Sequence, residues 1–373
     1  MPIENNVIIA GGGLAGLIAA IHLSKAGLKV TVVEKHAFPH HKVCGEYISN
    51  EVLPYLQSLG ADPSALHPTR ISKFQFSSTS GKLISAMLPL GGFGLSRYAF
   101  DDFLMHKAQE NGCLIIKDTV QQVSFINDHF EVLTTTNGKL YSPIVLGAFG
   151  KRTALDNKLN RAFIKQLSPW LAIKAHYSGR FDNQLVALHH FKGGYCGVSK
   201  VENDKINICY LTDYATFKKY RDLTEFQEQV LCQNKHLKTL FQNFTMEFDA
   251  PMSIGQLCFE KKEAVKDHLL MIGDAAGLIH PLCGNGMSMA IHSAKISAEL
   301  VIRFLQYKEL SRSEMEQQYT QLWHYHFNKR LRMGRLLSTL LQKERLADLM
   351  TSGLANFPFI LPQLIKRTHG YHL

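Results

Sequence analysis

The sequence predicts an α/β fold in which two sheet systems are interleaved along one chain and a helical region follows them. Three observations support this prediction. Residues 7–33 have the order strand, glycine cluster, helix, strand, which is typical of a parallel β-α-β unit. Residues 170–259 contain mostly short strand-like runs between turn-forming clusters, as in an antiparallel sheet. From residue 309 onward the pattern is helical.

The elements follow in order along the chain. Residues 7–10 form a short apolar run suited to a buried parallel strand, and a helix is expected from residue 14 to the stop signal at Gly27. Residues 70–93 alternate around SSTSGK and GG turns, which predicts a hairpin of the second sheet. A helical stretch over 226–244 interrupts the later strands, and a long helix is expected from Gly286.

The composition excludes several classes of protein. Of the 373 residues, 46% are hydrophobic and 19% are charged, which excludes a disordered or fibrous chain. Seven scattered cysteines without a CxxC pair predict a reduced, cytoplasmic protein with neither a disulfide framework nor a metal site. The apolar residues 7–21 follow no basic segment and run into a glycine cluster, unlike a signal peptide. The net charge of +10 leaves nucleic acid, an anionic membrane and an anionic ligand open as partners.

The glycine cluster indicates a dinucleotide. Gly11, Gly13 and Gly16 fit G-x-G-x-x-G between a strand and a helix, so the backbone can approach a pyrophosphate at the helix N-terminus. Glu34 ends the next strand, where a carboxylate can bind the ribose hydroxyls. This pattern favours FAD or NAD over NADP.

A second signature lies at residues 269–294. A buried strand ends at Gly273-Asp274, a glycine-bearing loop follows, and a helix begins near Gly286. This arrangement presents a carboxylate and a second helix N-terminus to a ligand. A dinucleotide with a polyol chain and an electron-rich ring could use both.

With these motifs, the chain resembles the FAD-dependent oxidoreductases of the para-hydroxybenzoate hydroxylase fold, in its geranylgeranyl-reductase-like branch. The matching segments are GGGLAG with Glu34, HKVCGEYIS, Arg97 in LSRYAFDDFLMHKA, GAFGKR and GDAAGLIHPLCGNGM. The resemblance covers roughly residues 1–310. It implies a Rossmann-like FAD-binding domain of the GR2 type with an interleaved antiparallel-sheet substrate domain and a helical C-terminal region.

The resemblance also implies which residues contact FAD. The positions implied for the pyrophosphate and adenosine half are Gly11, Gly13, Ala15, Gly16, Glu34 and, through its backbone, Val120. The positions implied for the ribityl and flavin half are Lys42, Cys44, Gly45, Arg97, Asp274, Gly286 and Met287. Within this set, Arg97 would reach the phosphates or the ribityl chain.

The sequence departs from the family at two places. Phe149-Gly150 stands where many hydroxylases have Asp-Gly, a motif associated with NADPH, so NAD(P)H is kept only as a transient electron donor. In the strand GYCGVSK, Tyr195 is retained but the Trp and Pro of the reductase branch are absent. The flavin halogenases' Trp-x-Trp-x-Ile-Pro is absent as well.

Two chemistries fit such a scaffold, a monooxygenase that needs a dry pocket and a C=C reductase that needs an acid. The candidate catalytic residues are Tyr195, Cys44, Glu46 and His190. The missing Trp and Pro favour a hydroxylase or epoxidase acting on a hydrophobic aromatic or polyene/isoprenoid-like secondary metabolite. A geranylgeranyl-reductase-like C=C reductase is the alternative, and a non-catalytic nucleotide-binding protein is the third hypothesis.

The predicted domains are discontinuous. Residues 1–70, 97–160 and 262–310 are assigned to the FAD-binding domain, 71–96 and 161–261 to the substrate domain, and 311–373 to C-terminal helices. Residues 303–373 hold 11 Lys/Arg and 5 Asp/Glu. This basic region predicts either a solvated helix face or peripheral contact with the inner face of the membrane or a carrier that delivers the hydrophobic substrate. Nucleic-acid binding is not expected, because no binding module or interleaved stacking aromatics accompany the basic residues.

Overall fold

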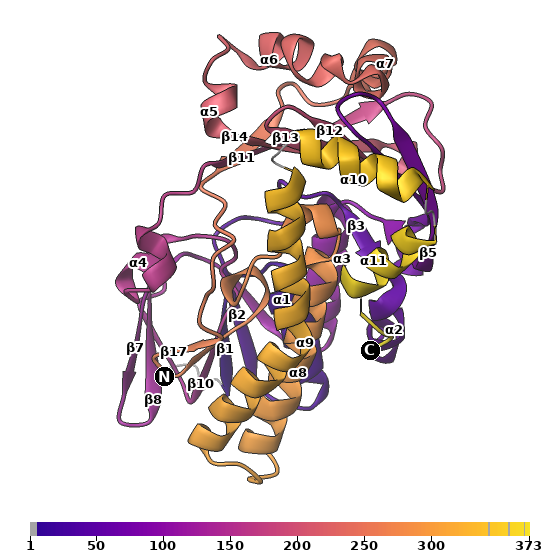
Figure 1. Cartoon of the computed structure of the whole chain (residues 1–373). Helices are drawn as coiled ribbons and strands as arrows, with labels where there is room; N and C mark the ends of the chain where they lie inside the picture. Colours follow the sequence, from indigo (N-terminus) through magenta and orange to yellow (C-terminus); the bar gives the residue numbers. More distant parts are fainter. Residues whose placement is uncertain (1–5, 342–343, 357–358, 369) are drawn as a thin grey trace.

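The computed structural model describes residues 6–341, 344–356, 359–368 and 370–373. It confirms the α/β fold class, with a parallel sheet, a large second sheet and a helical C-terminal region (Figure 1).

The parallel sheet has six strands in the order β17-β18-β10-β1-β2-β6. Its centre is β1 (Val7–Ala10), which pairs in parallel with β2 (Val30–Glu34) and β10 (Ile144–Gly147). The outer strands are β6 (Leu114–Lys117), β18 (Leu269–Met271) and the antiparallel β17 (Val265–Lys266). Every residue of β1, β2 and β10 is buried, as expected of strands covered on both faces.

Helices α1 (Leu14–Lys25), α3 (Arg97–Glu110) and α8 (Gly286–Leu305) pack with this sheet in one hydrophobic core. Short helices α2 (Leu53–Ser58) and α4 (Ala154–Lys158) lie at its margin. A three-stranded antiparallel sheet, made of β7 (Val120–Ile126), β8 (His129–Thr134) and β9 (Lys139–Ser142), connects β6 to β10.

The second sheet has nine strands, eight of them in the order β15-β11-β14-β13-β12-β4-β5-β3, with β16 also paired to β11. Two come from the predicted hairpin, β4 (Thr69–Ser77) and β5 (Leu83–Gly94), and β3 (Tyr47–Ser49) extends its edge. The remaining strands are β11 (Trp170–Ser178), β12 (Leu185–Phe191), β13 (Gly194–Lys200), β14 (Ile206–Asp213), β15 (Thr245–Met246) and β16 (Met252–Gly255).

The helical stretch expected over 226–244 is divided. Helix α6 (Leu223–Gln229) and helix α7 (Lys235–Asn243) are separated by a 3₁₀ turn, and α5 (Tyr214–Phe217) precedes them. The break has a local cause, because the Asn234 side chain accepts a hydrogen bond from the His236 N–H and caps a new helix. In Figure 1, α6 and α7 lie above the large sheet, and their apolar residues pack with its strands in a second core.

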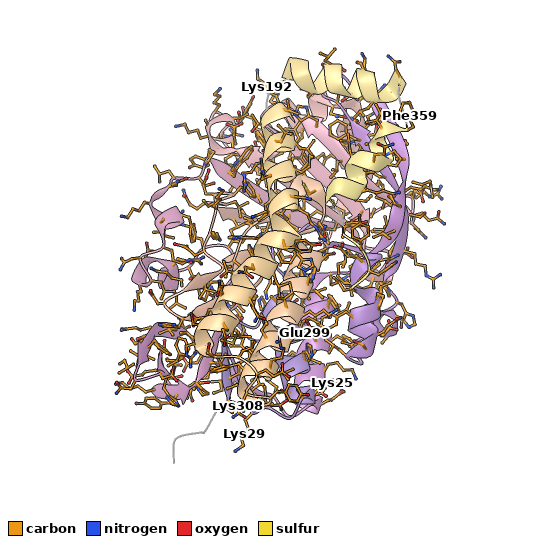
Figure 2. The ribbon with its side chains drawn as sticks, turned by 60° about the horizontal axis from the view of Figure 1, so that its bottom comes forward. Lys25, Lys29, Lys192, Glu299, Lys308 and Phe359 are labelled. Carbon is orange, nitrogen blue, oxygen red and sulfur yellow. The ribbon has the colours of Figure 1, made fainter. Side chains whose placement is uncertain are left out.

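The C-terminal helices are α9 (Arg312–Leu341), α10 (Glu344–Asn356) and α11 (Ile360–Thr368). Helix α9 runs beside α8, and α10 and α11 pack against β5 on the other face of the large sheet (Figure 1). Arg330 of α9 is buried and pairs with Glu51 at 3.3 Å, so not all of the basic residues of this region face solvent. The exposed Lys25, Lys29 and Lys192, labelled in Figure 2, lie at both ends of the molecule. Among the described helices, none combines the length and apolarity needed to cross a membrane.

Candidate functional site

The glycine loop joins β1 to α1 and packs directly on the end of β10. Gly11 has φ +113°, and a Cβ there would lie 2.4 Å from the carbonyl oxygen of Ala148. A Cβ on Gly16 would lie 2.1 Å from the Gly11 carbonyl oxygen. Because both positions are closed by backbone atoms, each requires glycine.

The first turn of α1 is open to a ligand. Its N-cap is Gly13, which has no side chain to accept a hydrogen bond. The first N–H groups of this twelve-residue helix are therefore not bound by a capping side chain. Ala15 lies in the same turn and is buried. These free donors and the helix dipole are suited to a pyrophosphate.

Glu34 lies beside this loop, as the sequence predicts for a ribose-binding carboxylate. It is the last residue of β2 and is buried. One carboxylate oxygen accepts a hydrogen bond from the Gly12 N–H at 2.7 Å, and the other accepts from the His36 N–H at 3.0 Å. These bonds fix the carboxylate at the carboxyl edge of the sheet, next to the glycine loop.

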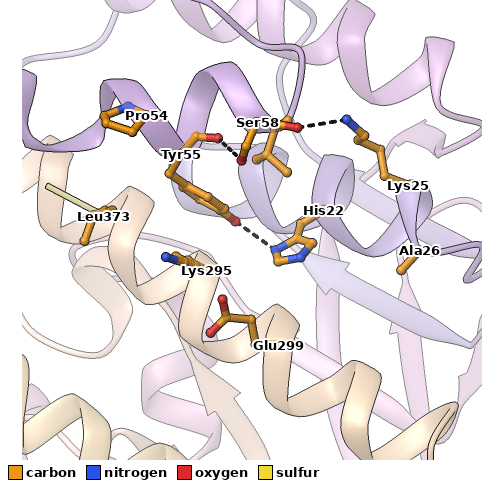
Figure 3. Close-up of a pocket in the computed structure, with 10 residues that line it drawn as sticks. His22, Lys25, Ala26, Pro54, Tyr55, Ser58, Lys295, Glu299 and Leu373 are labelled. Atoms are coloured by element: carbon orange, nitrogen blue, oxygen red, sulfur yellow. Dashed lines mark hydrogen bonds between the residues drawn. The ribbon is translucent and has the colours of Figure 1, made fainter.

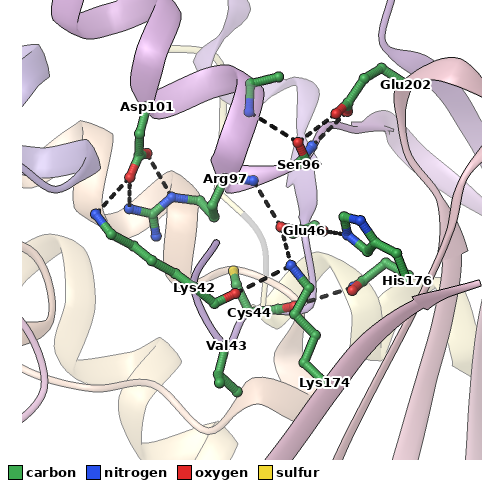
Figure 4. A network of polar contacts seen from close by, with 12 residues as sticks. Lys42, Val43, Cys44, Glu46, Ser96, Arg97, Asp101, Lys174, His176 and Glu202 are labelled. Atoms are coloured by element: carbon green, nitrogen blue, oxygen red, sulfur yellow. Dashed lines mark hydrogen bonds and ion pairs between the residues drawn. The ribbon is translucent and has the colours of Figure 1, made fainter. Parts of the chain in front are cut away.

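Two cations share one buried carboxylate at the start of α3 (Figure 4). Arg97 donates two hydrogen bonds of 2.7 Å to Asp101, and Lys42 Nζ lies 2.8 Å from Asp101 Oδ2. Burial alone would raise the pKa of Asp101, but Arg97 and Lys42 lower it below its ordinary value. The Arg97 guanidinium also lies 3.8 Å from the position that a Cβ on Gly13 would occupy. The structure thus places both predicted cations beside the phosphate loop, held by an aspartate that the sequence did not single out.

The loop at residues 42–46 is held by a second buried network (Figure 4). Glu46 has φ +54° and is fully buried. Its carboxylate accepts hydrogen bonds from Lys174 Nζ, from His176 Nε2 at 2.7 Å and from the Arg97 N–H at 2.8 Å. Burial opposes the charge, but Lys174 and His176 lower the pKa of Glu46 below its ordinary value.

Glu46 is therefore an ionised acceptor with every contact directed at the scaffold, and its predicted role as a catalytic acid stays a prediction. The residues that sequence reasoning missed are Lys174 and His176. They alternate with apolar residues in WLAIKAHYS, and a lysine within a buried strand was the available signal.

The third loop follows β18 and carries Asp274. Asp274 is half-buried, and within the described part of the chain its carboxylate accepts no hydrogen bond from the protein. Its backbone carbonyl accepts from Lys262 Nζ at 2.8 Å, and the carbonyl of Ala275 accepts from the buried Arg161 at 2.8 Å. Two buried cations thus fix the loop backbone while the Asp274 carboxylate remains available.

Helix α8 begins at Gly286, and its N-cap makes no side-chain hydrogen bond to the first turn. Cys44 Sγ lies 3.5 Å from Met287 Sδ, so the loop at 42–46 meets the start of α8. A Cβ on Gly45 would have no atom within 4 Å. FAD requires hydrogen-bond donors for its phosphates and an acceptor for its hydroxyls. The site offers two uncapped helix N-termini, the glycine loop, paired cations and the free Asp274 carboxylate, so the residues present fit this cofactor. Val120 begins β7, three residues after Lys117, which pairs with Glu34 on the neighbouring strand, and its predicted contact with the adenine stays a prediction.

An apolar cavity of about 180 Å³ adjoins these loops. The large sheet contributes Phe74, Phe76, Leu188 and Tyr195 to its wall, and the loop after Asp274 contributes Pro281, Leu282 and Cys283. Gly45 lies at the border of the cavity and belongs to the loop at residues 42–46, called here the flavin-side loop. The remaining wall comes from the C-terminal helices through Leu337, Leu354, Leu361, Leu364 and Ile365.

Of the candidate catalytic residues, Tyr195 lines this cavity and His190 does not. The His190 Nδ1 instead shares a 2.8 Å hydrogen bond with the Thr79 hydroxyl. Burial raises the pKa of Tyr195 well above its ordinary value. The catalytic assignments of these residues stay predictions, but Tyr195 is the one that a bound substrate could contact.

A second hollow of about 460 Å³ lies elsewhere, between α1, α2 and α8 (Figure 3). His22 and Lys25 border it from the last turn of α1, the end opposite the glycine loop. His22 Nδ1 lies 2.9 Å from the Tyr55 hydroxyl, and Lys25 donates to the Ser58 carbonyl at 3.1 Å. His22 and Lys25 are thus engaged within this hollow, which lies away from the motifs.

Comparison with known proteins agrees with this geometry. The family model described as FAD binding domain matches residues 4–308. The digeranylgeranylglycerophospholipid reductase of Methanococcus vannielii is 24% identical over 354 residues, covering 91% of this chain and 87% of that protein.

Two solved structures share the fold. The flavin-dependent brominase Bmp2 superimposes with a TM-score of 0.80 at 19% identity, covering 97% of this chain and 93% of that one. A geranylgeranyl bacteriochlorophyll reductase-like protein from Thermoplasma acidophilum gives 0.76 at 18% identity, covering 94% and 91%. From its glycine loop to helix α8, the chain belongs to the FAD binding domain family and is an FAD-dependent oxidoreductase.

Proposed function

We propose that the protein is a monooxygenase-type flavoenzyme that hydroxylates or epoxidises a hydrophobic aromatic or polyene/isoprenoid-like substrate. The cavity beside the flavin-side loops carries this proposal. None of the described residues that line it bears a charge, and apolar side chains from three parts of the chain enclose it. Such a pocket excludes water from the reacting groups, which oxygen transfer requires.

The titratable groups of the cavity support oxygenation over reduction. Burial raises the pKa of Cys209 and of Cys283 to about 12, and it also raises that of Tyr195. These groups hold their protons at neutral pH and are weak proton donors. Reduction of a C=C bond would need a proton that these groups supply only weakly, whereas insertion of an oxygen atom would not need one from them.

The chain's own residues hold the reactants in this proposal. The α1 N-terminus, Arg97 and Lys42 would bind the phosphates of FAD, and Asp274 would orient the ribityl chain. Bound FAD supplies two-electron chemistry and, when reduced, reaction with O₂. One oxygen atom of O₂ would enter the substrate, and the other would leave as water with two electrons from the flavin and two protons.

One observation favours a second candidate. The similarity to digeranylgeranylglycerophospholipid reductase extends over 91% of this chain and 87% of that protein. A reductase of this type would add a hydride from reduced flavin and a proton across a C=C bond of an isoprenoid. Its proton would have to come from one of the weakly acidic groups above or from solvent.

The two candidates are separable with the purified holoenzyme. Absorbance near roughly 370 and 450 nm reports bound oxidised FAD. The flavin is then reduced, mixed with a polyprenol or an aryl polyene, and exposed to labelled O₂. Product containing one labelled oxygen atom supports the monooxygenase, and saturated product formed without O₂ refutes it in favour of the reductase. A protein that cannot be reconstituted with FAD would refute both.

A further inference from the structure

We propose that Tyr195 and His280 form a recognition site for one uncharged oxygen, a hydroxyl or a carbonyl, on an otherwise apolar substrate. The inference rests on the proposed function, because it assigns a substrate to the apolar cavity. It adds that this substrate has a polar end and that the polar end is bound at the flavin side of the large sheet.

The first observation is a pair of buried side chains with unused hydrogen-bonding capacity. His280 is 4% exposed and Tyr195 is 7% exposed. Neither nitrogen of the His280 ring has a hydrogen-bond partner among the described residues, and neither does the Tyr195 hydroxyl. Buried polar atoms are almost always paired in folded proteins, because an unpaired one loses its bonds to water without replacement. Three such atoms in one place indicate a missing partner.

The second observation is their position. Tyr195 comes from β13 and lines the cavity, whereas His280 directly precedes Pro281, which also lines it. The centroids of the Tyr195 and His280 rings are 5.8 Å apart. The two polar side chains therefore lie where the large sheet meets the loop that follows Asp274, at the border between the substrate wall and the predicted flavin site.

The surroundings of His280 define the chemistry that it can bind. Its ring lies 4.6 Å from the Phe259 ring and 5.8 Å from the Trp170 ring, measured between centroids. Burial in this aromatic enclosure lowers the pKa of His280 to about 3, so the ring is neutral and keeps one donor and one acceptor. Tyr195 also stays neutral and adds a hydroxyl that can donate or accept.

A neutral donor and acceptor set in an aromatic enclosure selects against a charged head group. A carboxylate would lose its hydration there without gaining a counter-ion from either residue. A phenol, a quinone carbonyl or an alcohol would satisfy the unused atoms, while its apolar remainder extends into the cavity. Arg335 donates to the backbone carbonyl of Phe259, whose ring packs on His280, at 3.5 Å, and so has an acceptor within the protein.

Helix α9 fixes the loop that carries His280. A Cβ on Gly334 would lie 3.4 Å from the His280 Cβ and 3.1 Å from Cys283 Sγ, so the helix backbone packs on this loop. The recognition site is thus held between the large sheet and the C-terminal helices.

The test compares two ligands that differ only in the oxygen, a naphthol and the corresponding methylnaphthalene. Binding to the holoenzyme is measured by calorimetry and by quenching of Trp170. We expect His280→Phe and Tyr195→Phe each to weaken naphthol binding about tenfold, the equivalent of one hydrogen bond, and to leave methylnaphthalene binding unchanged. His280→Gln keeps a donor and an acceptor and should restore part of the loss.

Thermal unfolding of the ligand-free proteins gives an independent readout. Because the polar atoms are unpaired, removing them should leave the melting temperature unchanged or raise it, whereas a structural hydrogen bond would lower it. A clear drop in both Phe variants would overturn the proposal.

Three other outcomes would also overturn the recognition site. Equal binding of naphthol and methylnaphthalene to all variants would overturn the recognition site while leaving the apolar cavity intact. Failure of both ligands to bind the wild-type holoenzyme would overturn the cavity assignment and the proposed function with it. A complex in which ordered waters alone contact the three atoms would likewise overturn the site.

Discussion

The buried ion pair at Glu46 allows a quantitative test of how the flavin-side loop is held. The Glu46→Gln substitution preserves the shape of the side chain but removes its charge. Lys174 is then left buried, 0% exposed, beside a neutral amide. The hydrogen bond from the Arg97 N–H, which ties the loop to the start of α3, becomes weaker as well.

The expected loss follows from the burial of both partners. Breaking a buried ion pair by removing one charge costs about 3–5 kcal/mol. With an unfolding entropy of about 2.1 cal/mol/K per residue, a chain of this length unfolds with about 0.8 kcal/mol/K. Differential scanning calorimetry at pH 7 should therefore show the melting temperature falling by about 4–6 °C. The matched control is Asp182→Asn, since Asp182 pairs with Lys73 at the surface and should lose less than about 1 kcal/mol.

The pH dependence has a definite sign. The pKa of Glu46 is lower in the folded protein than in the unfolded chain, because Lys174 and His176 outweigh the cost of burial. Its stabilising contribution is present above the unfolded-state pKa and is lost as the pH falls through the folded-state pKa. The difference between wild type and Glu46→Gln should thus be full at pH 7 and shrink in acid. A melting temperature unchanged at pH 7, together with lost turnover, would refute this reasoning and favour proton transfer by Glu46.

Three further predictions concern the cofactor and the cavity. Gly16→Val should lower FAD affinity by at least about tenfold in a flavin titration, because the new side chain would collide with backbone atoms of the glycine loop. The control is Gly255→Ala, which should bind FAD normally because no atom lies within 4 Å of the added Cβ. Leu354→Trp should fill the cavity and reduce kcat/KM about tenfold with the FAD content unchanged, while Leu349→Trp, 69% exposed on the same helix, should have no effect. Asp101→Asn should weaken FAD binding about tenfold, since it releases the two cations beside the phosphate loop, and unaltered affinity would contradict that role.

Much of the cofactor half could be predicted because its signals are local. The predicted strand at 7–10 has the bounds observed for β1, and α1 begins at Leu14 as expected. Gly16 is required by its contact with Gly11 inside one β-α-β unit, whereas Gly11 is required by its contact with Ala148 after β10, and the spacing indicates both. Glu34 lies next to the glycine loop because adjacent parallel strands end at the same edge of the sheet.

The networks that hold the site could not be predicted in the same way. Asp101 is four residues from Arg97, but nothing in the spacing shows that Lys42, 59 residues away, shares it. Lys174 and His176 reach Glu46 across 128 and 130 residues. Such contacts depend on how the two sheets pack, and a single sequence carries no signal for that arrangement.

The C-terminal helices show that helical periodicity identifies the apolar face of a helix but not the surface against which that face packs. Leu337 of α9 lies in the cavity wall, so this apolar residue packs on the protein body. The basic residues of this helix suggested a docking surface, but Arg330 is directed inward to Glu51, whose backbone carbonyl also accepts from the Leu373 N–H at 2.9 Å. An inward ion pair next to an inward leucine indicates that this part of α9 was selected for packing on the protein itself.

This placement changes how the positive charge of the chain relates to its function. Under the proposed function, Arg97 and Lys42 would direct part of the charge to the anionic cofactor, whereas Arg330 anchors a helix that lines the cavity. Burial raises the pKa of Glu51 and Arg330 lowers it, so the buried cation at 3.3 Å offsets part of the cost of burying this carboxylate. Leu337 of the same helix lines the cavity, so the packing that keeps Glu51 paired also holds part of the cavity wall in place.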